Sequence, residues 1–395
     1  MAGPSDQRRA FVIVVDGLGA GAEPDAAAYG DAGANTLAHV ARVAGGLTLP
    51  AFEHLGLGNI EPLEGVGVSP APVLHGTLAH AGAGKDSTTG HWELMGVVSD
   101  DPLPAFADGL PERLVDRLTA ATGLRFCGGG AIDGIAALDE LGPHHLQSGE
   151  VILYTSVDSV VQLAAHEDVL PVGALHEACA AARCELTGPD AVGRVIARPF
   201  RGVPGAFERT HDRRDFSLAP PSRSYLDAAQ ERGIPVRAVG KVGDLFAGRG
   251  IDAVHPGSSN DEALASLDAL VDRLASGLVV ANLIDTDQRH GHRKDVAGFA
   301  AALGAIDAAL ARWLRALGPG DLLIITADHG VDPAMTHSDH TRERVPLLAR
   351  FAGHGGRRHD GTMADVGASA LAWLGGGDEP GLPGTSFLEG LTALI

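Results

Sequence analysis

Three short apolar runs in this chain each end at an aspartate. FVIVV leads into Asp16, LVVANLI into Asp285 and LLIITA into Asp328. A continuous run of apolar and β-branched residues is typical of a strand that is buried on both faces, as in a parallel sheet. Ligands of open parallel sheets gather beyond the carboxyl ends of the strands. The pattern therefore predicts a parallel sheet with acidic groups at its ligand-binding edge.

Helical patterns connect these runs. NDEALASLDALVDRLASG, before the second run, places leucines on one helical face, with Asn260 as the expected N-cap and Gly277 as the stop. VAGFAAALGAIDAALARWLRAL, before the third run, has the same periodicity. A strand, helix and strand in this order predict a right-handed parallel crossover. We expect an α/β core in which a mostly parallel sheet is flanked by helices.

The middle of the chain has a different pattern. Residues 100–215 mix shorter strands, such as VILYTS and VGRVIARPF, with helices such as ALHEACAAARCE, and proline and glycine interrupt them. The length of 395 residues allows two or three domains. We therefore expect an inserted α+β cap domain over 100–215 and a discontinuous core made of 1–99 and 216–395.

Charge and cysteine content exclude several classes of protein. The formal net charge of −20 argues against binding to nucleic acid or to an anionic membrane, because both need a cationic surface. The three cysteines form no C-x-x-C pair, which argues against a disulfide framework. No signal-type apolar stretch follows the polar N-terminus, and FVIVV is too short to span a membrane. We expect a cytoplasmic monomer.

Aspartate and histidine cluster at the predicted strand ends. The clusters are VVDGLG, LIDTDQRHGH, ITADHG and THSDHTRER. Mixed carboxylate and imidazole ligands suit Mn²⁺ or Zn²⁺, whereas Mg²⁺ and Ca²⁺ prefer oxygen ligands. The ligands exceed the needs of one ion, and two ions about 3.5–4 Å apart would suit phosphoryl transfer. GLGAG lacks the G-x-G-x-x-G spacing of a dinucleotide site.

The segment AGKDSTTGHWELMG, residues 82–95, adds three adjacent hydroxyl groups. Its pattern is typical of a helix start, where free N–H groups and the helix dipole favour phosphate. A hydroxyl bound to a metal there would become a usable nucleophile. A plain N-cap without chemistry explains the same pattern. The spacing alone does not choose among Ser87, Thr88 and Thr89.

Seven segments together resemble the phosphopentomutase family of the alkaline phosphatase superfamily. They are VVDGLGAG, GKDSTTGHWELMG, YTSVDSVVQLAAHE, GRVIARPFRGVPGAFERT, VGKVGDLFAGRGI, NLIDTDQRHGHRKD and ITADHGVDP with SDHTRERVPLL. They follow one another in order over almost the whole chain. Sulfatases and phosphatases of the superfamily would share the metal ligands but not the middle segments.

The resemblance implies two metal sites, with Mn²⁺ as the expected ion. The ligands of one ion would be Asp287, His292 and His340, and those of the other Asp16, Asp328 and His329. Thr89 would be the phosphorylated residue and would lie at both metals. By the same comparison, Asp285, His290 and His337 are not primary ligands.

The resemblance also implies the substrate and the reaction. The matching sugar-phosphate positions are Ser156, Asp158, Arg194, Ile196, Arg209 and Lys241. An arginine fork binds two phosphate oxygens at once, and an aspartate accepts hydrogen bonds from ribose hydroxyls. The implied enzyme is an isomerase of nucleoside catabolism that interconverts (deoxy)ribose 1-phosphate and 5-phosphate. It would use phosphothreonine and a pentose bisphosphate, would need a sugar bisphosphate as activator, and would exclude water with its cap.

Three other functions are compatible with parts of the pattern. A metal-dependent phosphohydrolase would use the same nucleophile behind a leakier cap. A phosphoglycerate mutase would share only the metal core. A non-catalytic sugar-phosphate-binding protein is disfavoured, because every nucleophile and ligand position is retained.

Overall fold

The computed structural model describes residues 8–156, 159–352 and 356–388. The chain divides into two compact units. Met1–Pro102 and Pro220–Ile395 form the first, called here the core unit, and Leu103–Ala219 form the second. The sequence placed these divisions at 99/100 and 215/216.

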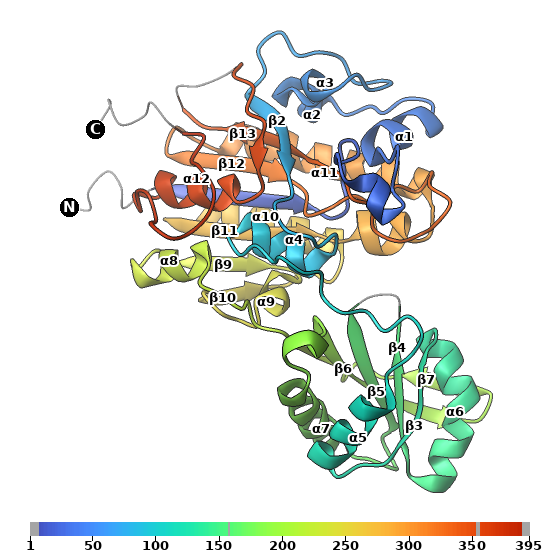
Figure 1. Ribbon diagram of the computed structural model, residues 1–395. Coiled ribbons are helices and arrows are strands. Elements are labelled where there is room, and N and C mark those ends of the chain that lie inside the picture. The colour runs from blue at the N-terminus through green and yellow to red at the C-terminus, as the bar shows by residue number, and fades with distance from the viewer. Residues whose placement is uncertain (1–7, 157–158, 353–355, 389–395) are drawn as a thin grey trace. The chain divides into compact units, whose positions relative to one another are not determined.

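The core unit is built on one eight-stranded sheet with the order β10-β9-β11-β1-β12-β13-β2-β14 (Figure 1). Its five strands from β10 to β12 are parallel, whereas β13 is antiparallel to both neighbours. The strands are β1 (Arg9–Val15), β2 (Leu74–Ala79), β9 (Val236–Val239), β10 (Ala253–His255), β11 (Gly277–Leu283), β12 (Asp321–Thr326), β13 (Val345–Arg350) and β14 (Gly361–Thr362). The mostly parallel sheet predicted from the sequence is confirmed.

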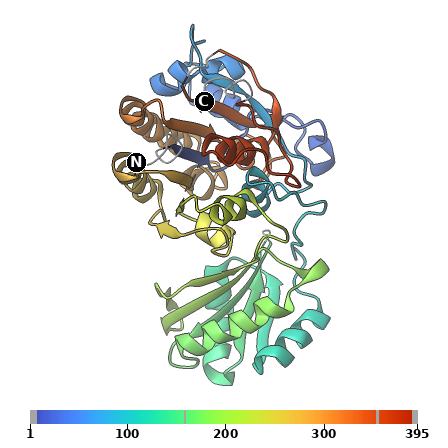
Figure 2. The same ribbon diagram turned by 90° about the vertical axis from the view of Figure 1, so that its left-hand side faces the viewer.

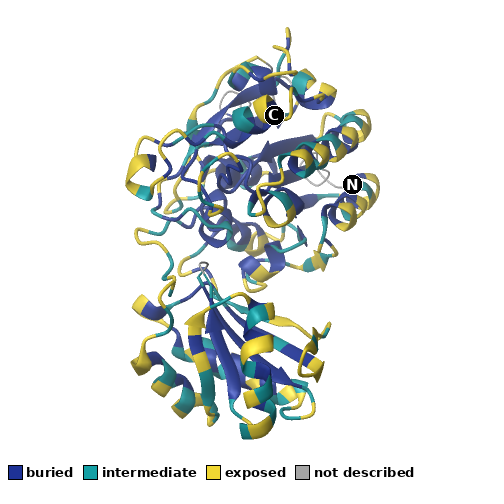
Figure 3. Ribbon diagram, turned by 90° about the vertical axis from the view of Figure 1, so that its right-hand side faces the viewer, coloured by how far each residue is buried: buried dark blue, intermediate teal, exposed yellow. Residues whose placement is uncertain are grey.

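The central strand β1 explains why the N-terminal run is apolar throughout. It lies between β11 and β12, where Val12 pairs with Val280 on one side and Ile324 on the other. All residues of β11 and β12 are buried, as are Ala10–Val15 of β1 (Figure 3). Because helices cover both faces of these strands, neither face has polar residues in alternation.

Two sets of helices flank this sheet. α10 and α11 pack on each other, and α11 also contacts α1 and α2. On the other face α12, drawn in red in Figure 2, contacts β1, β12, α4 and α8. The helices are α1 (Thr36–Val43), α2 (Pro50–Leu55), α3 (Leu57–Ile60), α4 (Ser87–Leu94), α8 (Tyr225–Glu231), α9 (Val242–Leu245), α10 (Asn260–Arg273), α11 (Val296–Ala316) and α12 (Asp365–Trp373), with the short turn η2 (Ala26–Tyr29).

Two details of these helices refine the sequence-based expectations. Ser259, not Asn260, caps α10, because its side chain accepts a hydrogen bond from the backbone N–H of Glu262. Of the residues that the structure describes, only the helix α11 is long and apolar enough to cross a membrane. Phe299 and Trp313 of α11 are buried, as in the core helix of a globular unit.

The second unit has a six-stranded mixed sheet in the order β3-β4-β5-β6-β7, with β8 also on β6. α5 and α7 cover one face and α6 covers the other. The strands are β3 (Phe126–Ala131), β4 (Val151–Thr155), β5 (Val160–His166), β6 (Arg194–Val203), β7 (Ala206–Arg209) and β8 (Arg214–Ser217). The helices are α5 (Glu112–Thr122), α6 (Gly134–Ser148) and α7 (Val172–Glu185), with the turn η3 (Gly188–Asp190).

The sequence suggested that the segment LGPHH interrupts the secondary structure of this unit, but it lies within one helix. α6 continues through Pro143 and ends at Gly149, which adopts a left-handed conformation with φ of 74°.

Candidate metal centre and active site

The acidic groups predicted at the strand ends meet at the carboxyl edge of the core sheet. Asp16 follows β1 directly, and Asp328 with His329 follows β12. Asp287 lies in the π-helical turn η4 (Thr286–Gly291), which is separated from the end of β11 by two residues. All four side chains are buried. Three adjacent parallel strands thus bring together residues that are far apart in the sequence.

Two groups of donor atoms form at this edge, and within each group the atoms lie within 4.8 Å of one another. One group is Asp16, Asp328 and His329, and the other is Asp287, His329 and His340. His329 Nε2 lies 3.5 Å from both Asp16 Oδ1 and Asp328 Oδ2. His340 Nε2 lies 3.3 Å from Asp287 Oδ1. Because both groups include His329, the two candidate cation positions are neighbours.

His292 lies next to the second group. Its Nε2 is 3.4 Å from Asp287 Oδ1, and its ring centroid is 4.7 Å from that of His340. Its Nδ1 is 2.6 Å from the Ser338 carbonyl oxygen. A hydrogen bond from Nδ1 to that carbonyl leaves Nε2 free to act as a ligand on the Asp287 side. All six predicted metal-ligand residues therefore lie at one place.

The charges at this edge suit a cation. Burial raises the pKa of Asp16, and the nearby Asp328 carboxylate raises it further. Burial also raises the pKa of Asp287, but His340 and His292 outweigh it, so the pKa falls below its ordinary value. Buried Asp287 Oδ1 and Asp328 Oδ2 have no well-formed hydrogen bond to a described residue. Carboxylates packed together in this way, with imidazoles, fit Mn²⁺ or Zn²⁺.

Two glycines allow the backbone to come close to these ligands. Gly17 has φ of 74°, and its N–H donates to Asp328 Oδ1 at 3.1 Å. A Cβ at Gly90 would lie 2.2 Å from the carbonyl oxygen of Asp328. α4 can therefore pack directly on the end of β12 only because residue 90 has no side chain.

The hydroxyl groups of residues 87–89 have different partners. Asp86 caps α4, and its Oδ1 accepts from the backbone N–H groups of Thr88 and Thr89 at 2.9 and 3.1 Å. Thr89 Oγ1 donates to Asp86 Oδ2 at 2.7 Å. The N-cap carboxylate thus binds the Thr89 hydroxyl, and the position of Thr89 at the two metals stays a prediction.

The Ser87 hydroxyl lies next to candidate metal ligands. Its Oγ lies 3.1 Å from His329 Nε2 and donates to Asp16 Oδ1 at 3.5 Å. Lys241 Nζ donates to the same Oγ at 3.4 Å, and it lies 2.9 Å from Asp16 Oδ2. Of the three hydroxyls, that of Ser87 contacts residues of the candidate metal centre.

His91 and Asn282 complete the centre and were not singled out from the sequence. His91 Nδ1 lies 3.1 Å from Asp328 Oδ2, and its Nε2 lies 3.1 Å from Asn282 Nδ2. Asn282 donates to Asp16 Oδ2 at 2.9 Å. A signal for Asn282 was present, since it is the one polar residue in the apolar run LVVANLI.

The three polar residues that the resemblance excludes as primary ligands contact other residues. Asp285 Oδ2 accepts from the backbone N–H of Asn260 at 3.0 Å, next to the start of α10. His290 Nδ1 lies 2.8 Å from Asp295 Oδ2. His337 Nε2 lies 3.1 Å from Asp31 Oδ1.

Lys85, for which the sequence suggested no role, connects two loops of the core unit. Its Nζ lies 3.1 Å from Asp31 Oδ2 and 3.7 Å from Asp339 Oδ2. The loop before α4 is thereby linked to the loop that contains His340.

Most of the predicted sugar-phosphate residues belong to the second unit. Ser156 follows β4, and Arg194 begins β6. Because β4 is antiparallel to β5 and β5 is parallel to β6, the end of β4 and the start of β6 lie at the same end of the sheet. A Cβ at Gly134 would lie 1.8 Å from Arg209 Nη2, so this guanidinium lies against the start of α6. Ile196 is buried within β6. Asp158 lies outside the described residues.

Comparisons with known proteins identify the family of this chain. The model of the Metalloenzyme superfamily matches residues 8–376. A phosphopentomutase of Anaeromyxobacter sp. (strain K) is 46% identical over 389 residues, which cover 98% of this chain and 99% of the relative. One from Caldanaerobacter subterraneus subsp. tengcongensis is 45% identical over 389 residues, with 97% and 98% covered. This chain belongs to the phosphopentomutase family.

Membership of the phosphopentomutases makes the protein an isomerase, an intramolecular phosphotransferase. The fold agrees at greater distance. The PH0037 protein of Pyrococcus horikoshii superposes with a TM-score of 0.50 at 13% identity, covering 95% of this chain and 99% of that one. The predicted alkaline phosphatase-like α/β fold is confirmed.

Proposed function

We propose that this phosphopentomutase interconverts (deoxy)ribose 1-phosphate and 5-phosphate through a phosphothreonine at Thr89 and a pentose bisphosphate. The observation that supports Thr89 is its position in the first turn of α4, which packs on the end of β12 where Asp328 lies. Ser87, whose Oγ lies 3.1 Å from His329 Nε2, is the alternative carrier.

Two divalent cations, with Mn²⁺ expected, would be held by the six residues at the strand ends. These are Asp16, Asp287, His292, Asp328, His329 and His340. When bound, such cations neutralise the charge of the transferred phosphoryl group and lower the pKa of a neighbouring hydroxyl.

The start of α4 has two features that suit a phosphoryl carrier. The positive end of the helix dipole there stabilises a phosphate. Lys241 Nζ, which donates to Ser87 Oγ at 3.4 Å, can contact the phosphoryl oxygens. We therefore propose that Lys241, one of the predicted sugar-phosphate residues, binds the transferred phosphoryl group.

The transfer balances in each direction. Phospho-Thr89 loses its P–O bond as the free hydroxyl of the pentose monophosphate attacks phosphorus, and the proton of that hydroxyl ends on Thr89 Oγ1. The bisphosphate then returns its other phosphoryl group to Thr89. A sugar bisphosphate would supply the first phosphoryl group to resting enzyme.

We propose that the second unit binds the sugar phosphate through Ser156, Asp158, Arg194, Ile196 and Arg209. The two arginines would bind phosphate oxygens. The role of this unit as a cap, the monomeric state and the cytoplasmic location stay predictions from the sequence.

Intact mass spectrometry with and without a pentose 1,5-bisphosphate, followed by peptide mapping, tests the carrier residue. We expect one added phosphate, on Thr89. Thr89→Ala should lose both the label and mutase activity, whereas Ser87→Ala should keep the label. A phosphate on Ser87, or full activity of Thr89→Ala, would contradict the proposal. Free phosphate formed faster than isomerised product would indicate a phosphohydrolase instead.

A further inference from the structure

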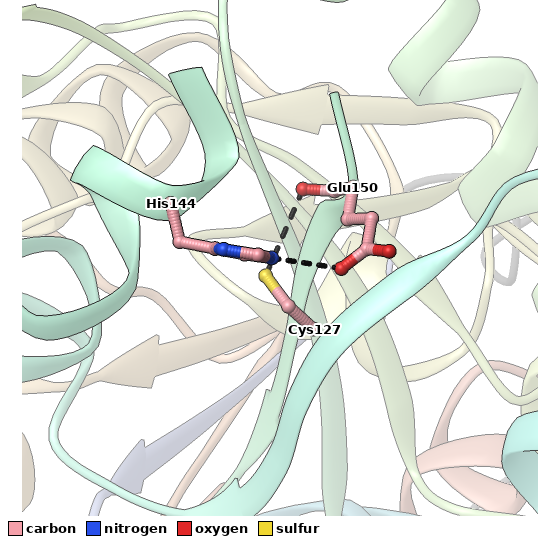
Figure 4. A group of neighbouring side chains, drawn as sticks. All are labelled: Cys127, His144 and Glu150. Carbon is pink, nitrogen blue, oxygen red and sulfur yellow. Dashed lines mark hydrogen bonds and ion pairs between the residues drawn. The ribbon is translucent and has the colours of Figure 1, made fainter. Parts of the chain in front are cut away.

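A thiol, an imidazole and a carboxylate converge in the second unit, away from every residue proposed above for metal or substrate. They belong to Cys127, His144 and Glu150 (Figure 4). One donor atom from each lies within 4.8 Å of the other two. His144 Nε2 is 2.9 Å from Glu150 Oε2, and Cys127 Sγ is 3.7 Å from the Glu150 carbonyl oxygen.

The β3-α6-β4 backbone brings these three residues together. β3 and β4 are parallel neighbours with Phe126 opposite Val151, so Cys127 and Glu150 lie where the two strands begin. His144 lies near the C-terminal end of α6, and Gly149 turns the chain from that end into β4. His145 Nδ1, 2.7 Å from the Glu150 carbonyl oxygen, fixes this turn.

The contacts already present do not account for the arrangement. The His144 side chain is 54% exposed, and an exposed ion pair of this kind contributes only about 0–1 kcal/mol. Burial, followed by the charge of Glu150, raises the pKa of Cys127, whereas a reactive thiol needs a lowered pKa. Arg125 lies 3.7 Å from Glu150 Oε1, which leaves Oε2 on the side of His144.

We propose that Cys127, His144 and Glu150 form a binding site for a thiophilic divalent cation, with Zn²⁺ as the fitting ion. Thiolate, imidazole and carboxylate are its usual ligands, and three of them leave one tetrahedral position for water. Binding replaces the thiol proton, which goes to solvent, by an Sγ–metal bond. Because the imidazole is half exposed, an ion can enter from the solvent.

The consequence for this unit is a cross-link. The ion would join the start of β3 to the end of α6 and the start of β4, which are otherwise held by strand pairing and by packing of α6. An ion that binds only the folded form stabilises it according to its concentration and its affinity. The proposal does not depend on the identity of the phosphoryl carrier.

Co²⁺ is the probe for this site, added to metal-free full-length protein. A thiolate bound to Co²⁺ gives a charge-transfer absorption in the near ultraviolet. Within the described part of the chain the other candidate donor groups contain only aspartate and histidine, so they give no such band. We expect one thiolate-bound Co²⁺ per chain at the plateau of this band, in addition to the Co²⁺ that the proposed dimetal site takes up. Cys127→Ser should abolish it, and His144→Ala should weaken binding at least about tenfold.

Cys184→Ser is the matched control, because Cys184 is an exposed thiol outside the cluster. The absence of the band in the wild-type protein would overturn the proposal, as would a band that survives in Cys127→Ser and is lost in Cys184→Ser.

A thermal measurement covers the case in which Cys127→Ser fails to fold. With Mn²⁺ in excess to saturate the proposed dimetal site, Zn²⁺ should raise the Tm of the wild-type protein but not that of Glu150→Gln or His144→Ala. Equal Tm shifts in all three proteins would overturn the proposal.

Discussion

Lys241 Nζ lies 2.9 Å from Asp16 Oδ2, so a residue proposed to bind the phosphoryl group forms an ion pair with a proposed metal ligand. Burial lowers the pKa of Lys241, but Asp16 and Asp287 outweigh it and keep the pKa above its ordinary value. The ammonium therefore compensates part of the negative charge gathered at the strand ends. Without this ammonium, more of that negative charge would have to be compensated by bound cations.

Replacing Lys241 by methionine should make folding depend more strongly on metal. Loss of one partner of a buried ion pair costs about 3 kcal/mol, and we expect this cost in the metal-free protein. Mn²⁺ should restore most of it, because the cations then compensate Asp16. The measurement is Tm with and without Mn²⁺. Lys85→Met is the control, since its partner Asp31 is not a proposed ligand, and its Tm loss should be the same in both conditions.

Gly90→Ala should damage the centre without changing any polar group. The new Cβ would lie 2.2 Å from the Asp328 carbonyl oxygen, so α4 must move away from the end of β12. We expect a loss of about 1–3 kcal/mol in stability, together with weaker metal binding and much lower activity. Gly304→Ala, in the helix α11 where a Cβ meets nothing within 4 Å, should be neutral or stabilising. Normal metal binding by Gly90→Ala would refute the close approach.

A comparison of Asp328→Asn with Asp285→Asn distinguishes a metal ligand from a residue that only contacts the start of a helix. Asp328 belongs to a donor group, so its variant should lose bound Mn²⁺. Asp285 contacts the start of α10, so its variant should keep its metal and lose about 1 kcal/mol of stability. Metal content by elemental analysis and Tm distinguish the two. Unchanged metal content in Asp328→Asn would remove this residue from the ligand set.

Glu343 should make stability depend on pH near neutrality. Burial raises the pKa of Glu343. Hydrogen bonds from Thr36 and Thr341 offset only part of this rise, so the pKa is about 7. Between about pH 4.5 and pH 7 the folded chain keeps a proton that the unfolded chain has lost. Stability should therefore fall as pH rises through this window, by up to about 3 kcal/mol.

Glu343→Gln tests this dependence. The amide keeps one oxygen that can accept from the N–H groups of Gly21 and Thr36, but its NH2 group replaces the oxygen that accepts from the hydroxyls of Thr36 and Thr341, so the variant should be less stable at about pH 5. Its Tm should nevertheless decline less between about pH 5 and about pH 8 than that of the wild-type protein. Parallel Tm curves for the two proteins would show that Glu343 does not titrate in this range.

Gly134→Ala tests the proposed role of Arg209 without replacing the arginine. The added Cβ would lie 1.8 Å from Arg209 Nη2, and it would also lie 2.7 Å from the hydroxyl oxygen of buried Tyr154, so Tm is measured beside the KM. We expect a higher KM for the pentose phosphate with unchanged metal content, as in Arg209→Ala. If Arg209 binds no substrate, both variants should keep the wild-type KM.

The strands and the acidic residues at their ends could be predicted because each rests on a local pattern. A run buried on both faces has no polar alternation, and its first polar residue lies at the edge where parallel strands end, as Asp16 and Asp328 do. The choice of the six ligands came from the family resemblance instead. The choice between Ser87 and Thr89 could not be made from the local pattern, because both residues fit the same helix start.

Pro143 shows a second limit of the sequence. Alone it predicts a break, yet α6 continues through it, because packing against β4 and β5 outweighs one lost backbone hydrogen bond. The same continuation places His144 beside Glu150, so the cluster with Cys127 could not be foreseen either.

The position of β1 has a consequence for synthesis on the ribosome. The first strand of the chain pairs with β11 and β12, which end at Leu283 and Thr326. Until those segments have been made, β1 has neither of its neighbours. The second unit is complete at Ala219 and has its own hydrophobic clusters. The second unit can therefore fold during translation, before the core unit is complete. The pairing of β1 with β11 and β12, which are far away in the sequence, is slow and comes last.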